Sequence, residues 1–186
     1  MRPLKVVCLG SSAGGLAPTM DFFKRLSPNT GITFVVIQHL KADTPSLTPG
    51  ILSNITSMTV SAANDQETAL PNHVYTMKPN AQLTIADGRF CVTPRTESPA
   101  RHKPFDRFLK SLAVDCGKRA TAIIFSGFDG DGSDGFIAIK KHGGTTYAQD
   151  RSAEVDEMPD HAIATGCVDF VLSPPDIAQR ISQSQQ

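Results

Sequence analysis

The chain has 186 residues, of which 40% are hydrophobic, and it carries 18 basic and 18 acidic side chains. This length and composition predict one ordinary globular domain that can bury a core without disulfides or a structural metal. The zero formal net charge gives no electrostatic case for binding nucleic acid, and no apolar run approaches the ~20 residues that span a bilayer. Because the sequence also shows no secretory leader, we expect a cytoplasmic protein with no nucleic-acid partner and no membrane insertion.

We expect one folded domain over residues 1–182 and a disordered polar tail over residues 183–186. The four cysteines are dispersed, with no C-x-x-C pair and no Cys/His cluster at zinc spacing. They are Cys8, Cys91, Cys116 and Cys167. We therefore expect four buried, reduced thiols and neither a metal nor an organic cofactor.

The first part of the chain predicts a strand, a glycine-rich turn and a helix, followed by a second strand. Residues 4–9 form an apolar run that ends in GSSAGG, and the apolar spacing over residues 16–26 is helical. Residues 34–37 form another all-apolar run. Continuous apolar runs, rather than alternating ones, indicate strands buried on both faces of a parallel sheet.

The middle of the chain predicts a small antiparallel flap inserted into an α/β domain. Asp87-Gly88 supplies a hairpin turn between short pieces of alternating polarity. The pieces cover residues 74–77, 83–86 and 89–93. After Pro104 the apolar spacing becomes helical, and Gly117 is placed to end that helix in a left-handed cap.

The last part of the chain alternates strands and helices. A strand over residues 120–125 leads through a second glycine-rich loop, SGFDGDGSDG, into a helix that ends near Gly143-Gly144. The remaining elements are a strand at 145–148, a helix at 158–165, a strand at 168–172 and a helix opened by Pro174-Pro175. The alternation predicts a doubly wound α/β fold with a mainly parallel sheet, helices on both faces and a small antiparallel hairpin flap.

The turn after the first strand matches G-x-S-x-G, with Ser12 rather than Ser11 at the central position. This motif exposes a serine hydroxyl on a tight strand-to-helix turn, where free N–H groups, beginning with that of Ala13, can stabilise an oxyanion. A plain tight turn and a phosphate cradle are the alternatives. The chain has no P-loop lysine and no G-x-G-x-x-G spacing here, so a nucleotide site is the second choice.

Two more side chains follow strands that can meet the serine. His39 lies two residues past the run at 34–37, and Asp131 lies in the loop after the strand at 120–125. Because the carboxyl ends of parallel strands gather at one edge, Ser12 could join them as nucleophile, with His39 as base and Asp131 as the orienting carboxylate. Taken singly, His39 is more often a strand-end histidine and Asp131 a turn residue. The chain order Ser, His, Asp disfavours an α/β-hydrolase.

On these motifs the sequence resembles the catalytic domain of the CheB methylesterases, from about residue 4 to residue 181. The family's G-x-S-x-G-G turn corresponds to residues 10–15, its Q-H pair to Gln38-His39, and its G-x-G-x-D-G loop to residues 127–132. The segments LPNHVYTMKPNAQL, RHKPFDRFLKSLA and DEMPDHAI extend the likeness. The wording PFDRFLKSLA is most similar to the methylesterase domains of hybrid CheB–CheR proteins.

The resemblance implies hydrolysis of glutamate methyl esters, and deamidation of glutamine, on a methyl-accepting chemotaxis receptor within two-component signalling. A fused or associated methyltransferase is a further implied partner. The implied triad is Ser12, His39 and Asp131, and the backbone of Ala13 and Phe128 would form the oxyanion hole. Arg101 and His102 could contact an acidic receptor surface, although an exposed basic pair is more often simply solvated.

Two other functions stay open: a non-catalytic docking module of a larger signalling protein, and an esterase for another small ester. The docking module is suggested by Asp129, because the family has glycine at this position. We expect the Asp129 carboxylate near the mouth of the site, where its charge would oppose an oxyanion. Its replacement by glycine should then raise activity about fivefold, less so at high salt. Asp129, Asp131 and Asp134 lack the EF-hand pattern, so we expect no cation site.

Overall fold

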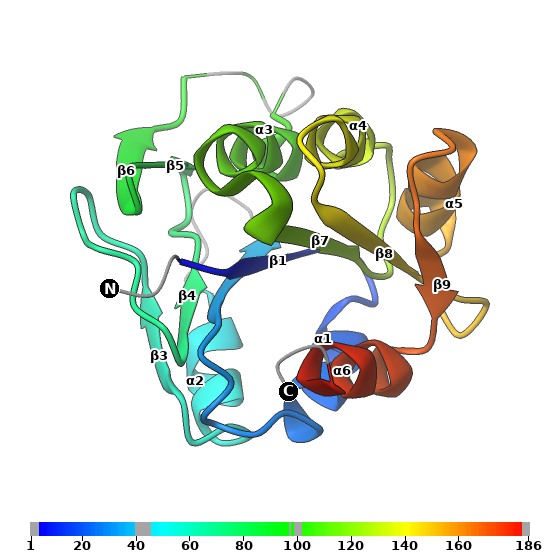
Figure 1. Cartoon of the computed structure of the whole chain (residues 1–186), viewed down its shortest axis with the longest axis horizontal. Helices are drawn as coiled ribbons and strands as arrows, with labels where there is room; N and C mark the ends of the chain where they lie inside the picture. Colours follow the sequence, from blue (N-terminus) through cyan, green and yellow to red (C-terminus); the bar gives the residue numbers. More distant parts are fainter. Residues whose placement is uncertain (1–3, 40–45, 97, 99–101, 184–186) are drawn as a thin grey trace.

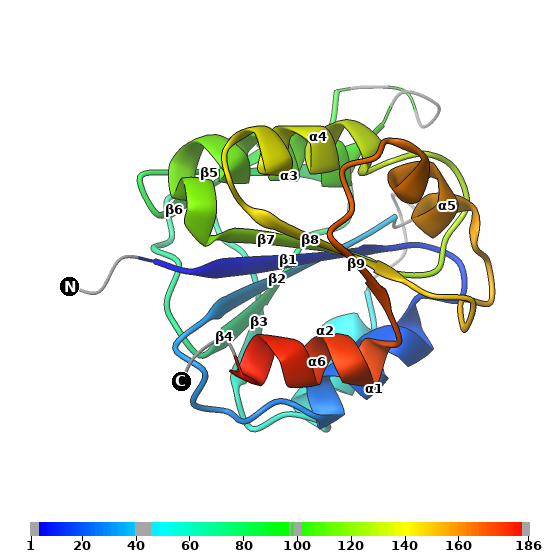
Figure 2. The same cartoon turned by 45° about the vertical axis from the view of Figure 1, so that its right-hand side comes forward.

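A seven-stranded sheet with helices on both faces forms the body of the molecule (Figures 1 and 2). The computed structural model describes residues 4–183 apart from 40–45, 97 and 99–101. The strands pair in parallel, in the order β3-β4-β2-β1-β7-β8-β9. They are β1 (Val6–Ser11), β2 (Thr33–Gln38), β3 (Thr59–Ala62), β4 (His73–Thr76), β7 (Ala120–Ile124), β8 (Thr145–Gln149) and β9 (Phe170–Leu172). The predicted doubly wound α/β fold is confirmed.

The helices lie in two layers, with α3, α4 and α5 on one side of the sheet and α1, α2 and α6 on the other (Figure 2). Their bounds are α1 (Leu16–Lys24), α2 (Thr48–Ser53), α3 (Pro104–Cys116), α4 (Ser133–Lys141), α5 (Glu157–Ala164) and α6 (Pro174–Gln183). A short 3-10 turn (Gly117–Arg119) joins α3 to β7. In the described part of the chain, no helix is long and apolar enough to cross a membrane.

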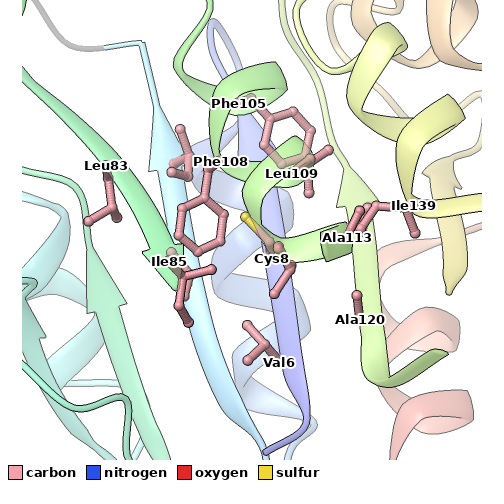
Figure 3. Close-up of a cluster of buried hydrophobic side chains, with 14 of the residues drawn as sticks. Val6, Cys8, Leu83, Ile85, Phe105, Phe108, Leu109, Ala113, Ala120 and Ile139 are labelled. Atoms are coloured by element: carbon pink, nitrogen blue, oxygen red, sulfur yellow. The ribbon is translucent and has the colours of Figure 1, made fainter. Parts of the chain in front are cut away.

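Two apolar cores form because successive side chains of a strand point to opposite faces. Along β1, Val6 and Cys8 join the core beneath α3 and α4, whereas Val7 and Leu9 join the core beside α1 and α6. Figure 3 shows the first core, in which Phe105, Phe108 and Leu109 of α3 lie over β1. Burial on both faces explains why β1 reads as a continuous apolar run.

The predicted flap is partly wrong. Only β5 (Ala81–Ala86) and β6 (Arg89–Pro94) form the antiparallel hairpin, turning at Asp87-Gly88. The third piece, residues 74–77, falls largely in β4, which pairs in parallel with both β2 and β3 of the main sheet. A strand of four residues is too short for its alternation to distinguish a flap from a central strand.

The expectation of four buried thiols is also wrong in part. All four cysteines are free, but only Cys8 and Cys116 are buried, while Cys91 and Cys167 are half-buried. Burial raises the pKa of Cys116 to about 12, and burial followed by the charge of Asp131 raises the pKa of Cys8. Both buried thiols are therefore held in the unreactive protonated form.

The C-terminal ends of two helices, α3 and α6, differ from expectation. Gly117 ends α3 at φ 53, but its ψ of −125 lies outside the left-handed helical region that was predicted. Helix α6 continues through Gln183, one residue into the predicted disordered tail, and residues 184–186 lie outside the described part of the chain.

The strand order places a switch point at β1, because the chain turns to β2 on one side of it and to β7 on the other. Ser11 is the register partner of Gln38 on β2, and Gly10 is the partner of Ile124 on β7. The residues that follow these strands therefore emerge together at one edge. In open α/β sheets, this edge is where ligands bind.

Candidate active site

The turn after β1 presents Ser12 and buries Ser11. The Ser12 N–H donates to the carbonyl of Ser126 at 2.9 Å, and the Ser12 carbonyl accepts from the Gly15 N–H at 3.1 Å. These bonds tie the turn to the end of β7 and to the start of α1. Ser12 is half-buried whereas Ser11 is only 2% exposed, so Ser12 carries the accessible hydroxyl of the turn.

Glycines allow this turn to pack against its neighbours. A Cβ on Gly10 would lie 2.3 Å from the Phe105 ring, and one on Gly14, whose φ is 72, would lie 2.7 Å from the Ser126 Oγ. Real Cβ atoms do not approach so closely, so the G-x-S-x-G spacing is required by close packing as well as by the turn.

His39 follows β2 and faces the loop after β7. Its backbone N–H donates to the Ser11 carbonyl at 3.4 Å, and its ring Nε2 lies 2.7 Å from Asp131 Oδ2. Burial alone would lower the pKa of His39, but the hydrogen bond and charge of Asp131, with the charge of Asp129, raise it above its ordinary value. The ring is thus oriented by a carboxylate and has increased basicity.

Asp131 is 1% exposed, and the start of α3 holds its carboxylate. Oδ2 accepts the Phe105 N–H at 3.0 Å, and Oδ1 accepts the Asp106 N–H at 2.8 Å. Free N–H groups and the helix dipole at a helix N-terminus favour negative charge. Asp131 can therefore remain an acceptor while it orients His39.

Asp106 is a supporting residue that the sequence analysis missed. It is 3% exposed, and its Oδ1 accepts the N–H groups of Gly132 at 2.9 Å and Gly135 at 2.7 Å, at the start of α4. Burial raises the pKa of Asp106, the Gly135 hydrogen bond lowers it, and the charge of Asp131 raises it further. An acidic residue two positions after Pro104 is a known helix-start pattern, but that pattern does not reveal which loop the side chain reaches.

Asp129 lies beside His39, on the side opposite Asp131. Its Oδ2 is 3.4 Å from His39 Nδ1, and its Oδ1 accepts the Asp131 N–H at 2.7 Å. The residue has a φ of 74, in the left-handed region that favours glycine. Its exposed position at the mouth of the site matches the expectation, but the group that its carboxylate contacts is the His39 ring.

The structure brings the loops of Ser12, His39 and Asp131 to the same edge of the sheet. Among the described residues, His39 contacts Asp131, but Ser12 Oγ has no hydrogen bond to the His39 ring. Phe128 is 55% exposed in the loop after β7, and Ala13 is half-buried, its carbonyl accepting the Ser126 hydroxyl at 2.8 Å. Arg101 lies outside the described residues.

Three of the other four histidines, His73, His142 and His161, contact backbone carbonyls. The ring Nδ1 of His161 lies 2.9 Å from the Asp129 carbonyl, that of His73 is 3.2 Å from the Pro71 carbonyl, and that of His142 is 2.9 Å from the Ala138 carbonyl. Within the described residues, no group of three or more His, Cys, Asp or Glu side chains could hold a metal ion.

Comparison with known proteins assigns the chain to a family. The sequence model of the family described as CheB methylesterase matches residues 7–181. The chain belongs to the CheB methylesterase family. The solved catalytic domain of the Thermotoga maritima CheB methylesterase is similar in fold, with a TM-score of 0.88, 26% sequence identity, and coverage of 97% of this chain and 98% of that one. The family resemblance seen in the sequence is thus confirmed.

Longer relatives in the CheB family carry a functional name. A Methylobacillus flagellatus protein named protein-glutamate methylesterase/protein-glutamine glutaminase is 32% identical over 184 residues, covering 96% of this chain and 52% of that protein. A Bordetella parapertussis protein of the same name is 33% identical over 184 residues, covering 95% and 52%. The chain therefore spans about half the length of these relatives.

Proposed function

We propose that this domain is a serine hydrolase that removes methyl groups from glutamate methyl esters, and deamidates glutamine, on a bacterial chemotaxis receptor in the cytoplasm. The observation that carries the proposal is the 2.7 Å contact between His39 Nε2 and Asp131 Oδ2, formed beside the turn that carries the half-buried Ser12. The names of the relatives support the choice of substrate. A receptor-modifying methyltransferase is the natural partner enzyme, because it forms the ester that this reaction breaks.

In the proposed reaction, His39 takes the Ser12 hydroxyl proton as Ser12 Oγ attacks the ester carbonyl. Asp131 stabilises the imidazolium that forms, and backbone amides at Ala13 and Phe128 support the oxyanion. Collapse of the tetrahedral intermediate breaks the bond to the methoxy group, which leaves as methanol with the proton from His39. Water, activated by His39, then hydrolyses the acyl-enzyme to a glutamate carboxylate and free Ser12.

The exposed side chain of Phe128 is consistent with a protein substrate. An apolar ring that is 55% exposed beside a catalytic serine offers a contact for a helical receptor surface.

The test is methanol release from a receptor fragment methylated with a labelled methyl group. We expect the purified domain to release labelled methanol, and Ser12→Ala to lose on the order of 10⁶-fold in rate. An aryl ester serves as the second substrate. Hydrolysis of the aryl ester without any action on the receptor would indicate an esterase for another small ester, and receptor binding without release would indicate a docking module.

A further inference from the structure

Both ring nitrogens of His39 face a carboxylate. Asp131 Oδ2 lies 2.7 Å from Nε2, and Asp129 Oδ2 lies 3.4 Å from Nδ1. Because Asp131 occupies Nε2, Nδ1 is the nitrogen left to take a proton from Ser12. Asp129 therefore sits against the atom that the proposed reaction needs.

This arrangement favours a protonated ring. A neutral imidazole has one N–H and one lone pair, so one of its nitrogens would face a carboxylate oxygen with its lone pair. An imidazolium presents an N–H to each carboxylate. A protonated His39, however, has no lone pair with which to accept the Ser12 proton.

The loop holds Asp129 in this position by several bonds. Its Oδ1 accepts the Asp131 N–H at 2.7 Å, as in an Asx turn, which helps the residue adopt its φ of 74. Its N–H donates to Glu157 Oε2 at 3.3 Å, and its carbonyl lies 2.9 Å from the His161 ring. The side chain itself is 54% exposed, so it can turn away from His39 into solvent.

We propose that Asp129 is a positioning residue that holds His39 in a protonated resting arrangement, and that Ser12 becomes nucleophilic when the Asp129 carboxylate leaves Nδ1. The consequence for hydrolysis rests on the proposed function. A rise in pH that deprotonates the His39 ring removes the attraction between the imidazolium and the Asp129 carboxylate. Salt weakens the same attraction because Asp129 is exposed.

Other charged groups near His39 act on it indirectly. Asp106 of α3 donates its N–H to Asp131, and its Oδ2 lies 3.8 Å from Lys103 Nζ. The charge of Asp131 also contributes to the raised pKa of the Cys8 thiol on β1. Glu157 and His161 of α5 contact the Asp129 backbone. None of these contacts is with the His39 ring, so the effect of Asp129 on His39 can be separated from theirs by substitution.

The direct test is an NMR titration of the His39 ring. Asp129→Asn keeps the size, the Oδ1 acceptor and the tolerance of positive φ, but it removes the charge. Asp87→Asn is the matched control, because Asp87 also has a positive φ of 50, in the β5–β6 turn. We expect His39 to titrate at lower pH in Asp129→Asn and unchanged in Asp87→Asn. An unchanged His39 titration in Asp129→Asn would overturn the proposal.

The second test is the pH dependence of methanol release. We expect the rising limb of the profile to move to lower pH in Asp129→Asn, with a gain of roughly fivefold near neutral pH that shrinks at high pH and at high salt. Asp129→Gly, which relieves the backbone strain, should behave alike. Equal rates at every pH would overturn the proposal. If no variant releases methanol but the His39 titration still shifts, the proposed function fails and the positioning of His39 by Asp129 stands.

Discussion

The Asp131 carboxylate binds the start of α3, the helix that carries Asp106, and the Asp106 carboxylate binds the start of α4, the helix that follows Asp131. Asp131 accepts the N–H of Asp106 at the start of α3, while Asp106 accepts the N–H groups of Gly132 and Gly135 at the start of α4. The loop that carries the orienting carboxylate of His39 is thereby fixed to two helices at once. Because the two carboxylates are buried and share this network, changing one should displace the other.

We expect Asp106→Ala to destabilise the fold and to weaken the contact between His39 and Asp131. The change leaves the buried N–H groups of Gly132 and Gly135 without an acceptor, which costs about 2–4 kcal/mol. Urea unfolding followed by circular dichroism measures this loss. Asp106→Asn keeps an acceptor oxygen and should lose less than half as much.

The control for Asp106 is Asp115→Ala on the same helix. Asp115 accepts the Gly88 N–H at 3.2 Å, in the hairpin rather than at the site. It should lower stability by a smaller amount and leave the His39 titration unchanged. Equal stability of Asp106→Ala and the unmodified domain would contradict the assigned role of Asp106.

Gly10→Ala should destabilise the domain through a steric clash. Its Cβ would lie 2.3 Å from the Phe105 ring, so the ring or β1 must move, at about 1–3 kcal/mol. Gly50→Ala is the matched control, because no heavy atom lies within 4 Å of a Cβ there and the residue is helical. That change should stabilise by roughly 0.5–1 kcal/mol. Thermal unfolding measures the melting temperatures of both variants. Similar melting temperatures for Gly10→Ala and Gly50→Ala would refute the packing argument.

Phe128→Ala tests whether the exposed ring contacts the substrate. Under the proposed function, we expect KM for the methylated receptor to rise about tenfold, which corresponds to the loss of one partly buried apolar contact. The free energy of unfolding should stay within about 0.5 kcal/mol, because the ring is 55% exposed. Val114→Ala, at a residue that is 74% exposed on α3, should change neither quantity. An unchanged KM in Phe128→Ala would exclude the ring from receptor binding.

The sequence was most informative where one physical rule dominates. The run over β1 is apolar on both faces, the GSSAGG turn permits close packing, and parallel strands end at a common edge. These rules predicted that Ser12, His39 and Asp131 would emerge near one another. They could not predict α2, because its Pro49 and Gly50 are typical of a loop and only its packing on the sheet makes it helical.

Long-range polar contacts were beyond the sequence. Asp106 reaches amides 26 and 29 residues further along the chain, a distance that no local pattern encodes. Asp129 was correctly expected near the mouth of the site, but its left-handed backbone turns its carboxylate to the His39 ring, and this depends on the shape of the folded loop.

The raised pKa of His39 predicts a specific pH dependence of stability. Burial alone would lower this pKa, but the hydrogen bond and charge of Asp131 and the charge of Asp129 raise it. A group that binds a proton more tightly when folded stabilises the fold fully below its unfolded pKa of about 6.5, and this contribution disappears as pH rises through the higher folded pKa. The slope cannot exceed about 1.4 kcal/mol per pH unit for one proton. We therefore expect the difference in unfolding free energy between the unmodified domain and His39→Gln to shrink as pH rises above neutrality, as measured by urea titrations. His142→Gln, at the far end of α4 from the Asp131 loop, is the control for losing a histidine. A difference that stayed constant with pH would show that the fold does not favour protonated His39.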